Sequence, residues 1–117
     1  MGRVGTICYS HSRGLGHLAK SFIDAKVIDD IYVVRHPSIP MKPWYPDAPI
    51  TDIRRVNIPD EWLREHTALL LFETPFDWST VERCRKFGVR TYLVTMYECS
   101  PDKFPTTPDV LLCPSIL

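Results

Sequence analysis

Residues 4–18 read VGTICYSHSRGLGHL and contain three patterns in succession. The first six residues are apolar and β-prone, which predicts a buried strand. A polar turn with glycines at positions 14 and 16 follows. From His17 to about Ile28 apolar residues then recur at spacings of three and four, which predicts an amphipathic helix. A strand, a glycine turn and a helix in this order indicate an α/β protein.

The remainder of the chain repeats this alternation. Residues 68–72 (ALLLF) form an unalternating apolar run, which is typical of a central parallel strand covered on both faces. Further elements are predicted as strands at 31–35, 89–95 and 110–113, a weaker strand near 53–58, and helices at 60–66 and 79–87. The last helix begins with the capping-box pattern Ser79-x-x-Glu82 and is expected to end before Gly88. We expect a single domain over residues 1–117, with a Rossmann-like open, mostly parallel sheet of five or six strands and helices on both faces.

A proline-rich crossover occupies residues 36–50, with prolines at positions 37, 40, 43, 46 and 49. This spacing matches the three-residue turn of a polyproline II helix, which over this length would span on the order of 40 Å. Two roles are compatible with the segment. It uses Trp44 and Tyr45 to dock a partner or to line an acceptor groove, or it is an extended wrap that shields the edge of the sheet.

The overall charge balance does not point to a charged partner. The chain has 14 basic and 14 acidic residues, so its net charge does not indicate nucleic-acid or membrane-surface binding. It contains neither an apolar stretch of about 18 residues nor a secretory-signal pattern, so we expect no membrane span and a cytoplasmic location. The four cysteines include no C-x-x-C pair, which argues against a zinc site and a disulfide framework.

Three loops follow predicted strands at the carboxyl edge of the sheet, where ligands bind in open parallel sheets. They span residues 10–17, 73–77 and 95–98. In the first loop Gly14 and Gly16 allow a sharp turn, and the helix that follows directs free amides and a partial positive charge toward an anion. The loop is not a dinucleotide fingerprint or a Walker motif, because neither a third glycine nor a lysine-serine or lysine-threonine pair follows at the required spacing.

His17 stands directly after the second glycine, at the expected start of the helix. An imidazole can accept a proton from a hydroxyl nucleophile near neutral pH, which is the general-base role of a group-transfer reaction. The alternative is a histidine that only caps or packs the start of the helix. His11 is a second candidate base, whereas His36 and His66 are interpreted as ordinary surface or loop residues.

Two glutamates follow predicted buried strands, Glu73 and Glu98. A carboxylate in such a place is costly unless it is hydrogen-bonded or functional. Either one could orient His17 or bind acceptor hydroxyls, and either could equally be a solvated loop residue. Asp77 is expected to help start the next helix.

The strand, loop and helix of residues 7–18 resemble the opening of the GT-B glycosyltransferases, whose first loop is glycine-rich and often ends in glycine-histidine. The likeness continues through later segments that look like strand ends of the same N-terminal domain, namely FETPFD at 72–77, GVRT at 88–91, MYE at 96–98 and PDVLLCPS at 108–115. The resemblance therefore covers most of the chain.

This resemblance implies a hexosyltransferase-like function. In such enzymes the N-terminal domain holds the acceptor and supplies the base, and the C-terminal domain binds most of the nucleotide-sugar donor. His17 would be the base, Glu98 a second catalytic candidate, and Arg13 and Lys20 would help neutralise the leaving diphosphate. The remaining candidates for substrate or phosphate binding are Gly14, Gly16, Glu73, Thr74 and Tyr97. Neither a metal nor another cofactor is expected, because helix amides and basic side chains can carry out this neutralisation.

The chain departs from the family in one major respect, since residue 117 comes before any donor-binding half. We therefore expect it to be inactive alone and to need a donor-domain partner, with a homo-oligomer as another arrangement. Two further hypotheses stay open. One is a non-catalytic docking module that uses the proline-rich segment, and the other is an unrelated phosphate- or nucleotide-binding domain of flavodoxin-like shape.

Overall fold

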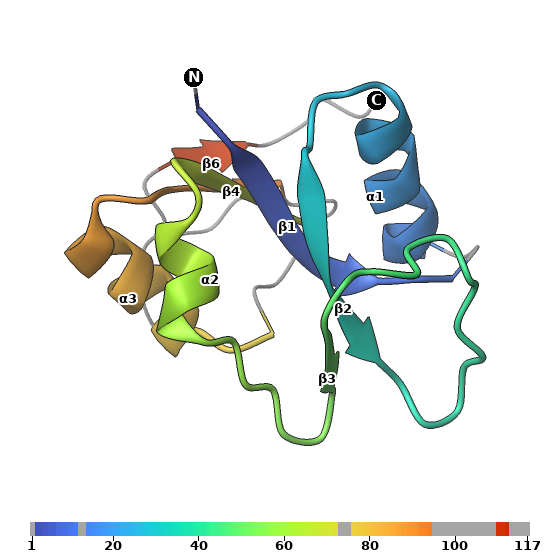
Figure 1. Ribbon diagram of the computed structural model, residues 1–117. Coiled ribbons are helices and arrows are strands. Elements are labelled where there is room, and N and C mark those ends of the chain that lie inside the picture. Colours follow the sequence, from blue (N-terminus) through green and yellow to red (C-terminus); the bar gives the residue numbers. More distant parts are fainter. Residues whose placement is uncertain (1, 12–13, 73–75, 95–109, 113–117) are drawn as a thin grey trace.

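The computed structural model describes residues 2–11, 14–72, 76–94 and 110–112 (Figure 1). Their elements are, in chain order, β1 (Val4–Tyr9), α1 (Gly14–Asp24), β2 (Asp30–Arg35), β3 (Ile50–Asp52), α2 (Asp60–Arg64), β4 (Ala68–Phe72), α3 (Ser79–Phe87), β5 (Arg90–Val94) and β6 (Val110–Leu112). The strands form one parallel sheet in the order β3-β2-β1-β4-β5-β6. The predicted Rossmann-like α/β fold is thus confirmed.

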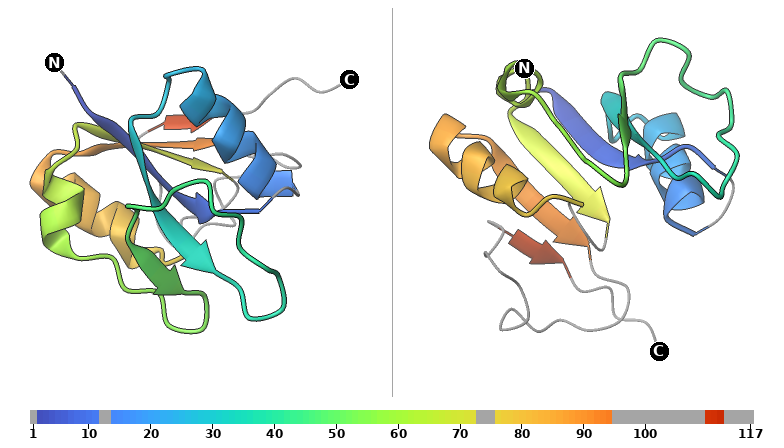
Figure 2. Two further views of the ribbon diagram at one scale, coloured as in Figure 1. Left: turned by 45° about the vertical axis from the view of Figure 1, so that its right-hand side comes forward. Right: turned by 90° about the horizontal axis from the view of Figure 1, so that it is seen from below.

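The sheet has an apolar layer on each face because its central strands carry large buried residues at successive positions. In β4, Leu69 and Leu71 join one core cluster, while Leu70 and Phe72 join the other. The first cluster lies under α2 and α3, which contribute Trp62, Leu63, Val81 and Cys84. The second lies under α1. Figures 1 and 2 show α1 on one side of the sheet and the other two helices on the opposite side.

The weaker strand predicted near residues 53–58 is wrong, because β3 is formed by Ile50–Asp52 instead. The Asp52 carboxylate accepts the Arg54 amide at 2.9 Å, and the Ile53 amide donates to the Arg35 carbonyl at 3.0 Å. An aspartate that binds the amide two residues ahead makes a turn. The chain therefore leaves the sheet after Asp52, where the predicted strand would have begun.

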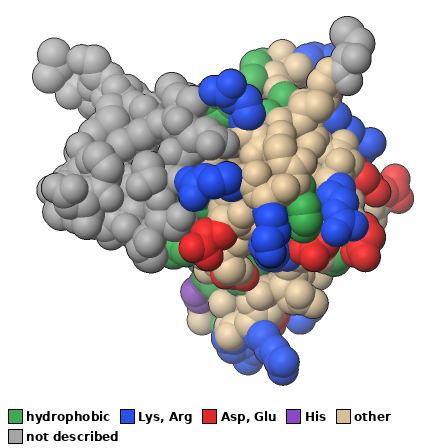
Figure 3. Space-filling model, turned by 90° about the vertical axis from the view of Figure 1, so that its left-hand side faces the viewer, with side chains coloured by type: hydrophobic (Ala, Val, Ile, Leu, Met, Phe, Trp, Pro, Cys, Tyr) green, Lys and Arg blue, Asp and Glu red, His purple; other side chains and the backbone are tan. Residues whose placement is uncertain are grey.

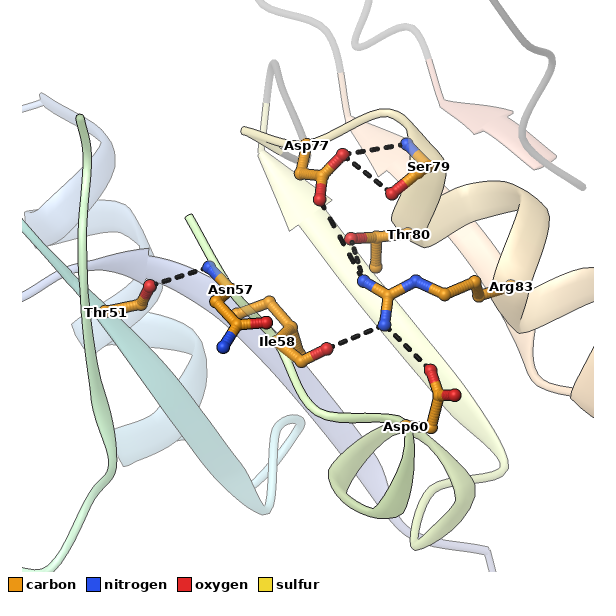
Figure 4. A network of polar contacts seen from close by, with 8 residues as sticks. All are labelled: Thr51, Asn57, Ile58, Asp60, Asp77, Ser79, Thr80 and Arg83. Atoms are coloured by element: carbon orange, nitrogen blue, oxygen red, sulfur yellow. Dashed lines mark hydrogen bonds and ion pairs between the residues drawn. The ribbon is translucent and has the colours of Figure 1, made fainter. Parts of the chain in front are cut away.

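Helix α3 ends as predicted but begins differently. Gly88 closes it in the left-handed conformation, at φ 75°. The expected capping box is not formed, since the Asp77 carboxylate accepts both the Ser79 amide, at 3.0 Å, and the Ser79 hydroxyl, at 2.8 Å. Arg83 then joins this helix to α2, donating to the Ile58 carbonyl at 2.7 Å and to Asp60 at 2.8 Å (Figure 4). The predicted role of Asp77 at the start of the helix is confirmed.

The proline-rich segment does not form one continuous polyproline II helix. That helix has no internal hydrogen bonds, whereas the Ile39 amide donates to the His36 carbonyl and the Ala48 amide to the Tyr45 carbonyl. The segment is instead held against the domain: Tyr45 and Ala48 pack on the core cluster under α1, and Trp44 stacks edge-on against Tyr45 at 6.2 Å. These contacts favour a covering role for the two aromatic residues.

Two bonds fasten the middle of this segment to the end of β1. The Lys42 amide donates to the Ser10 carbonyl at 2.7 Å, and the Ser10 hydroxyl donates to the Lys42 carbonyl at 2.8 Å. Ser10 is almost fully buried. The middle of the crossover is therefore attached at the carboxyl edge of the sheet.

The surface over α2 and α3 carries charges of both signs. Figure 3 shows lysine and arginine side chains interspersed with acidic ones on this face, and the exposed residues there include Arg64, Glu65, Arg85 and Lys86. Among the described residues of this face, charges of the two signs are therefore mixed. Within the described residues no helix is long and apolar enough to cross a membrane.

Candidate functional site

The direction of chain connection reverses between β1 and β4. From β1 the chain moves through α1 to β2 on one side, whereas from β4 it moves through α3 to β5 on the other. Parallel ladder pairing between β1 and β4 involves only Val4 with Ala68 and Gly5 with Leu69, at the amino ends of both strands. Ligands of open α/β sheets bind beyond the carboxyl ends of the strands at such a reversal. The candidate site is accordingly this part of the carboxyl edge.

The glycines after β1 belong to the first turn of α1, which corrects the expectation of a loop ahead of a helix starting at His17. Gly16 is buried, and a Cβ atom on it would lie 2.3 Å from the His11 carbonyl oxygen and 2.9 Å from the His11 amide nitrogen. Only a residue without a side chain fits there. With glycine at this position, the start of the helix packs directly against the backbone of His11, just after β1.

The thiol of Cys8 contacts the same turn. Cys8 in β1 donates through Sγ to the Leu15 carbonyl at 3.4 Å. Burial raises the pKa of Cys8 to about 12, against the lowering effect of a hydrogen bond with the Tyr9 backbone. A thiol that stays protonated is a poor nucleophile, so Cys8 is suited to supporting the helix start rather than to nucleophilic attack.

His17 is the fourth residue of α1 and is exposed at this edge. Its backbone carbonyl accepts the Ser21 hydroxyl at 3.1 Å. Among the described residues nothing forms a hydrogen bond or ion pair with its imidazole. The side chain is thus neither packed in the core nor used as a cap, and it is accessible to a ligand.

Lys20 lies one turn further along α1, and its charge is already paired. Its ammonium contacts both carboxylate oxygens of Asp24, at 2.8 and 2.7 Å, and lies 5.6 Å from the centre of the Trp44 ring. Any role in neutralising a diphosphate would have to compete with this ion pair. Gly14 is the first residue of the helix, so its amide has no hydrogen-bond partner within the helix.

The other sequence-based candidates lie outside the described residues. They are Arg13, Glu73, Thr74, Tyr97 and Glu98. Their proposed roles stay predictions.

Four rings gather at the same edge, although they are far apart in the sequence. Tyr9 stacks on His11 with 4.7 Å between ring centres and meets Phe76 edge-on at 5.1 Å and His36 at 6.4 Å. Tyr9 ends β1, while His11, His36 and Phe76 follow β1, β2 and β4, so the cluster spans the carboxyl ends of three neighbouring strands. Burial, followed by the nearby Cys8 thiol, raises the pKa of Tyr9, which keeps its phenol neutral. The sequence did contain a signal for this cluster, because a histidine or an aromatic residue follows each of the three strands.

His66 is not the ordinary surface or loop residue that the sequence suggested. It is buried at the opposite, amino edge of the sheet, where Nδ1 lies 2.7 Å from the Trp62 carbonyl and Nε2 lies 2.5 Å from Asp30. Each ring nitrogen therefore has a polar partner in the interior. Gly5 makes room for the ring, since a Cβ there would lie 2.7 Å from the imidazole.

The described residues contain no group of three or more His, Cys, Asp or Glu side chains suited to a metal ion. Comparisons with protein-family models, curated proteins and solved structures gave no match.

Proposed function

We propose that this chain is the acceptor-binding half of a glycosyltransferase that moves a sugar from a nucleotide sugar to a hydroxyl acceptor. The observation that carries the proposal is the accessible imidazole of His17 at the first turn of α1, beside the reversal of chain connection. A second α/β domain, in the same polypeptide or in a partner, would bring the donor.

In this mechanism His17 removes the proton from the acceptor hydroxyl while the oxygen attacks the anomeric carbon of the donor. The bond between that carbon and the diphosphate oxygen breaks, and the nucleoside diphosphate leaves. The free amides at the start of α1 face the side on which negative charge develops, which favours departure of the diphosphate.

The ring cluster of Tyr9, His11, His36 and Phe76 supports the acceptor side of the proposal. Flat apolar rings with polar edges are suited to the alternating apolar and hydroxyl-bearing faces of a sugar. The close approach at Gly16 brings the helix that bears His17 directly against His11 in this cluster. Base and stacking surface therefore share one edge.

The test is a release assay on the complete gene product, including any domain that follows residue 117. UDP-glucose, UDP-N-acetylglucosamine and GDP-mannose are incubated with a panel of free sugars and sugar phosphates, and nucleoside diphosphate is measured. We expect acceptor-dependent release that falls by about 10²–10⁴-fold in His17→Ala. The pH profile of the residual activity should lose its acidic limb.

Ser21→Ala is the matched control, because this exposed residue lies one turn further along the same helix. It should keep full turnover, and both variants should keep the circular dichroism spectrum of the wild type. Turnover unchanged in His17→Ala rejects the base, and absence of release with every donor rejects the transferase.

A further inference from the structure

A second feature of the carboxyl edge shares His36 with the ring cluster. A cavity of about 490 Å³ lies at the ends of β2 and β3. It is lined by Arg35, His36, the segment 37–41, Asp52 and Arg54. This volume is in the range of small-ligand sites.

The two arginines of this cavity are not equivalent. Arg54 holds Asp52 in a two-point ion pair, with Nε 2.9 Å from Oδ1 and Nη2 2.8 Å from Oδ2. The Arg35 guanidinium approaches the same carboxylate only to 3.6 Å, which exceeds hydrogen-bonding distance. Among the described residues nothing else binds the Arg35 side chain. Its fork of N–H donors is therefore available to a ligand.

Asp52 is bound mainly by Arg54. Hydrogen bonds from the Arg54 side chain and amide hold its pKa well below the usual range, and the charges of Arg54 and Arg35 add to this effect. The carboxylate stays ionised and committed to Arg54. The two guanidinium groups and the one carboxylate leave the cavity with a single net positive charge.

His36 adds a second donor. Its Nδ1 accepts the Ser38 amide at 3.0 Å, so the hydrogen of a neutral ring is on Nε2. The ring is partly buried and contacts Tyr9 of the ring cluster at 6.4 Å between centres. His36 therefore belongs both to the lining of the cavity and to the ring cluster.

We propose that this cavity binds the oxyanion of a small ligand, a phosphate ester or a carboxylate, through the guanidinium of Arg35 and the Nε2–H of His36. A planar fork that meets two oxygens of one anion gives both charge and geometry. If the proposed function holds, on which this step rests, the ligand is the acceptor, and the acceptor is a phosphorylated or carboxylated sugar.

The experiment is calorimetric titration of the complete gene product, without donor, with inorganic phosphate, glucose 6-phosphate, glucuronate and neutral glucose. We expect glucose 6-phosphate or glucuronate to bind and glucose to bind far more weakly. The stronger of the two identifies the source of the oxyanion. Arg35→Gln should weaken binding of that ligand about ten- to a hundredfold, and Arg35→Lys should restore only part of it.

Arg55→Gln is the matched control, because it removes the same charge from an exposed residue that does not line the cavity. It should bind as the wild type does, and an unchanged amide NMR spectrum shows that each variant is folded. The proposal is overturned if no anion binds, if Arg55→Gln loses as much affinity as Arg35→Gln, or if an oligothymidylate binds more tightly than the small anions. Anion binding by a wild-type protein that releases no nucleoside diphosphate with any donor would reject the transferase and leave this cavity as an anion site.

Discussion

At the scale of single residues, the start of α1 depends on a missing side chain. Gly16→Ala should lower the free energy of unfolding by about 1–3 kcal/mol, because the new Cβ would meet backbone atoms of His11 that cannot move independently. Urea unfolding checks this, with Ser21→Ala as the control in the same helix. Helix propensity alone predicts the opposite sign, a gain of about 1 kcal/mol, so a more stable Gly16→Ala would contradict the packing argument.

Single residues were predicted from sequence where local pattern decides their position. The position of His17 near the start of a helix could be predicted, since the glycines and the apolar periodicity lie within a few residues of it. The burial of His66 could not, because it depends on Gly5 and Asp30, which belong to other strands. The ring cluster was missed for the same reason.

At the scale of elements, α2 and α3 are joined by one side chain. Arg83 is partly buried, and its guanidinium reaches Ile58, Asp60 and, more distantly at 3.9 Å, Asp77 (Figure 4). Arg83→Ala should cost about 1–2 kcal/mol in urea unfolding, since it leaves a carbonyl without its charged donor and the ion pairs are partly solvated. Lys86→Ala, an exposed change on the same helix, should cost almost nothing. Equal losses in the two variants would show that the junction contributes no stability.

The ends of elements were predicted unevenly. The end of α3 at Gly88 followed from one residue with a distinctive backbone preference. Its beginning and the position of β3 were decided by the aspartates Asp77 and Asp52, whose carboxylates bind amides two residues ahead. Such turns compete with capping boxes and strands, and the sequence alone does not say which of them forms.

At the scale of the whole molecule, the amino edge is held by a chain of charges. Arg3 binds Asp30 at 2.7 Å, and Asp30 binds the buried His66, so the beginnings of β1 and β2 are tied to the segment ahead of β4. Burial of Asp30 would raise its pKa, but the hydrogen bonds and charges of His66 and Arg3 outweigh burial and lower it.

This lowered pKa makes stability depend on pH. A carboxyl group with a depressed folded pKa contributes stability above its unfolded value of about 3.9, and that contribution is lost as the pH falls through the folded value. Asp30→Asn should therefore be less stable by about 1–2 kcal/mol at pH 7 and should lose less of its stability than the wild type between pH 5 and pH 2. Urea unfolding across this range, with the exposed Asp47→Asn as control, measures both effects. Parallel pH profiles for wild type and Asp30→Asn would contradict this account.

The architecture as a whole was the most predictable feature. Alternating strands and helices, with an unalternating apolar strand at 68–72, leave few options other than a covered parallel sheet. Strand order was not predicted, because it depends on the side of the existing sheet on which each new strand is added. The anion cavity was missed as well, since Arg35 and Arg54 come together only when β3 pairs with β2.

The attachment of the proline-rich crossover at Ser10 constrains the side chain of only one of its two residues. On the crossover side both bonds use the main chain of Lys42, so the identity of that side chain is irrelevant to the attachment. On the strand side a hydroxyl is required. Related sequences can therefore change the face that the crossover shows to solvent, including residues near the anion cavity, while the loop stays fixed at the same point of the sheet.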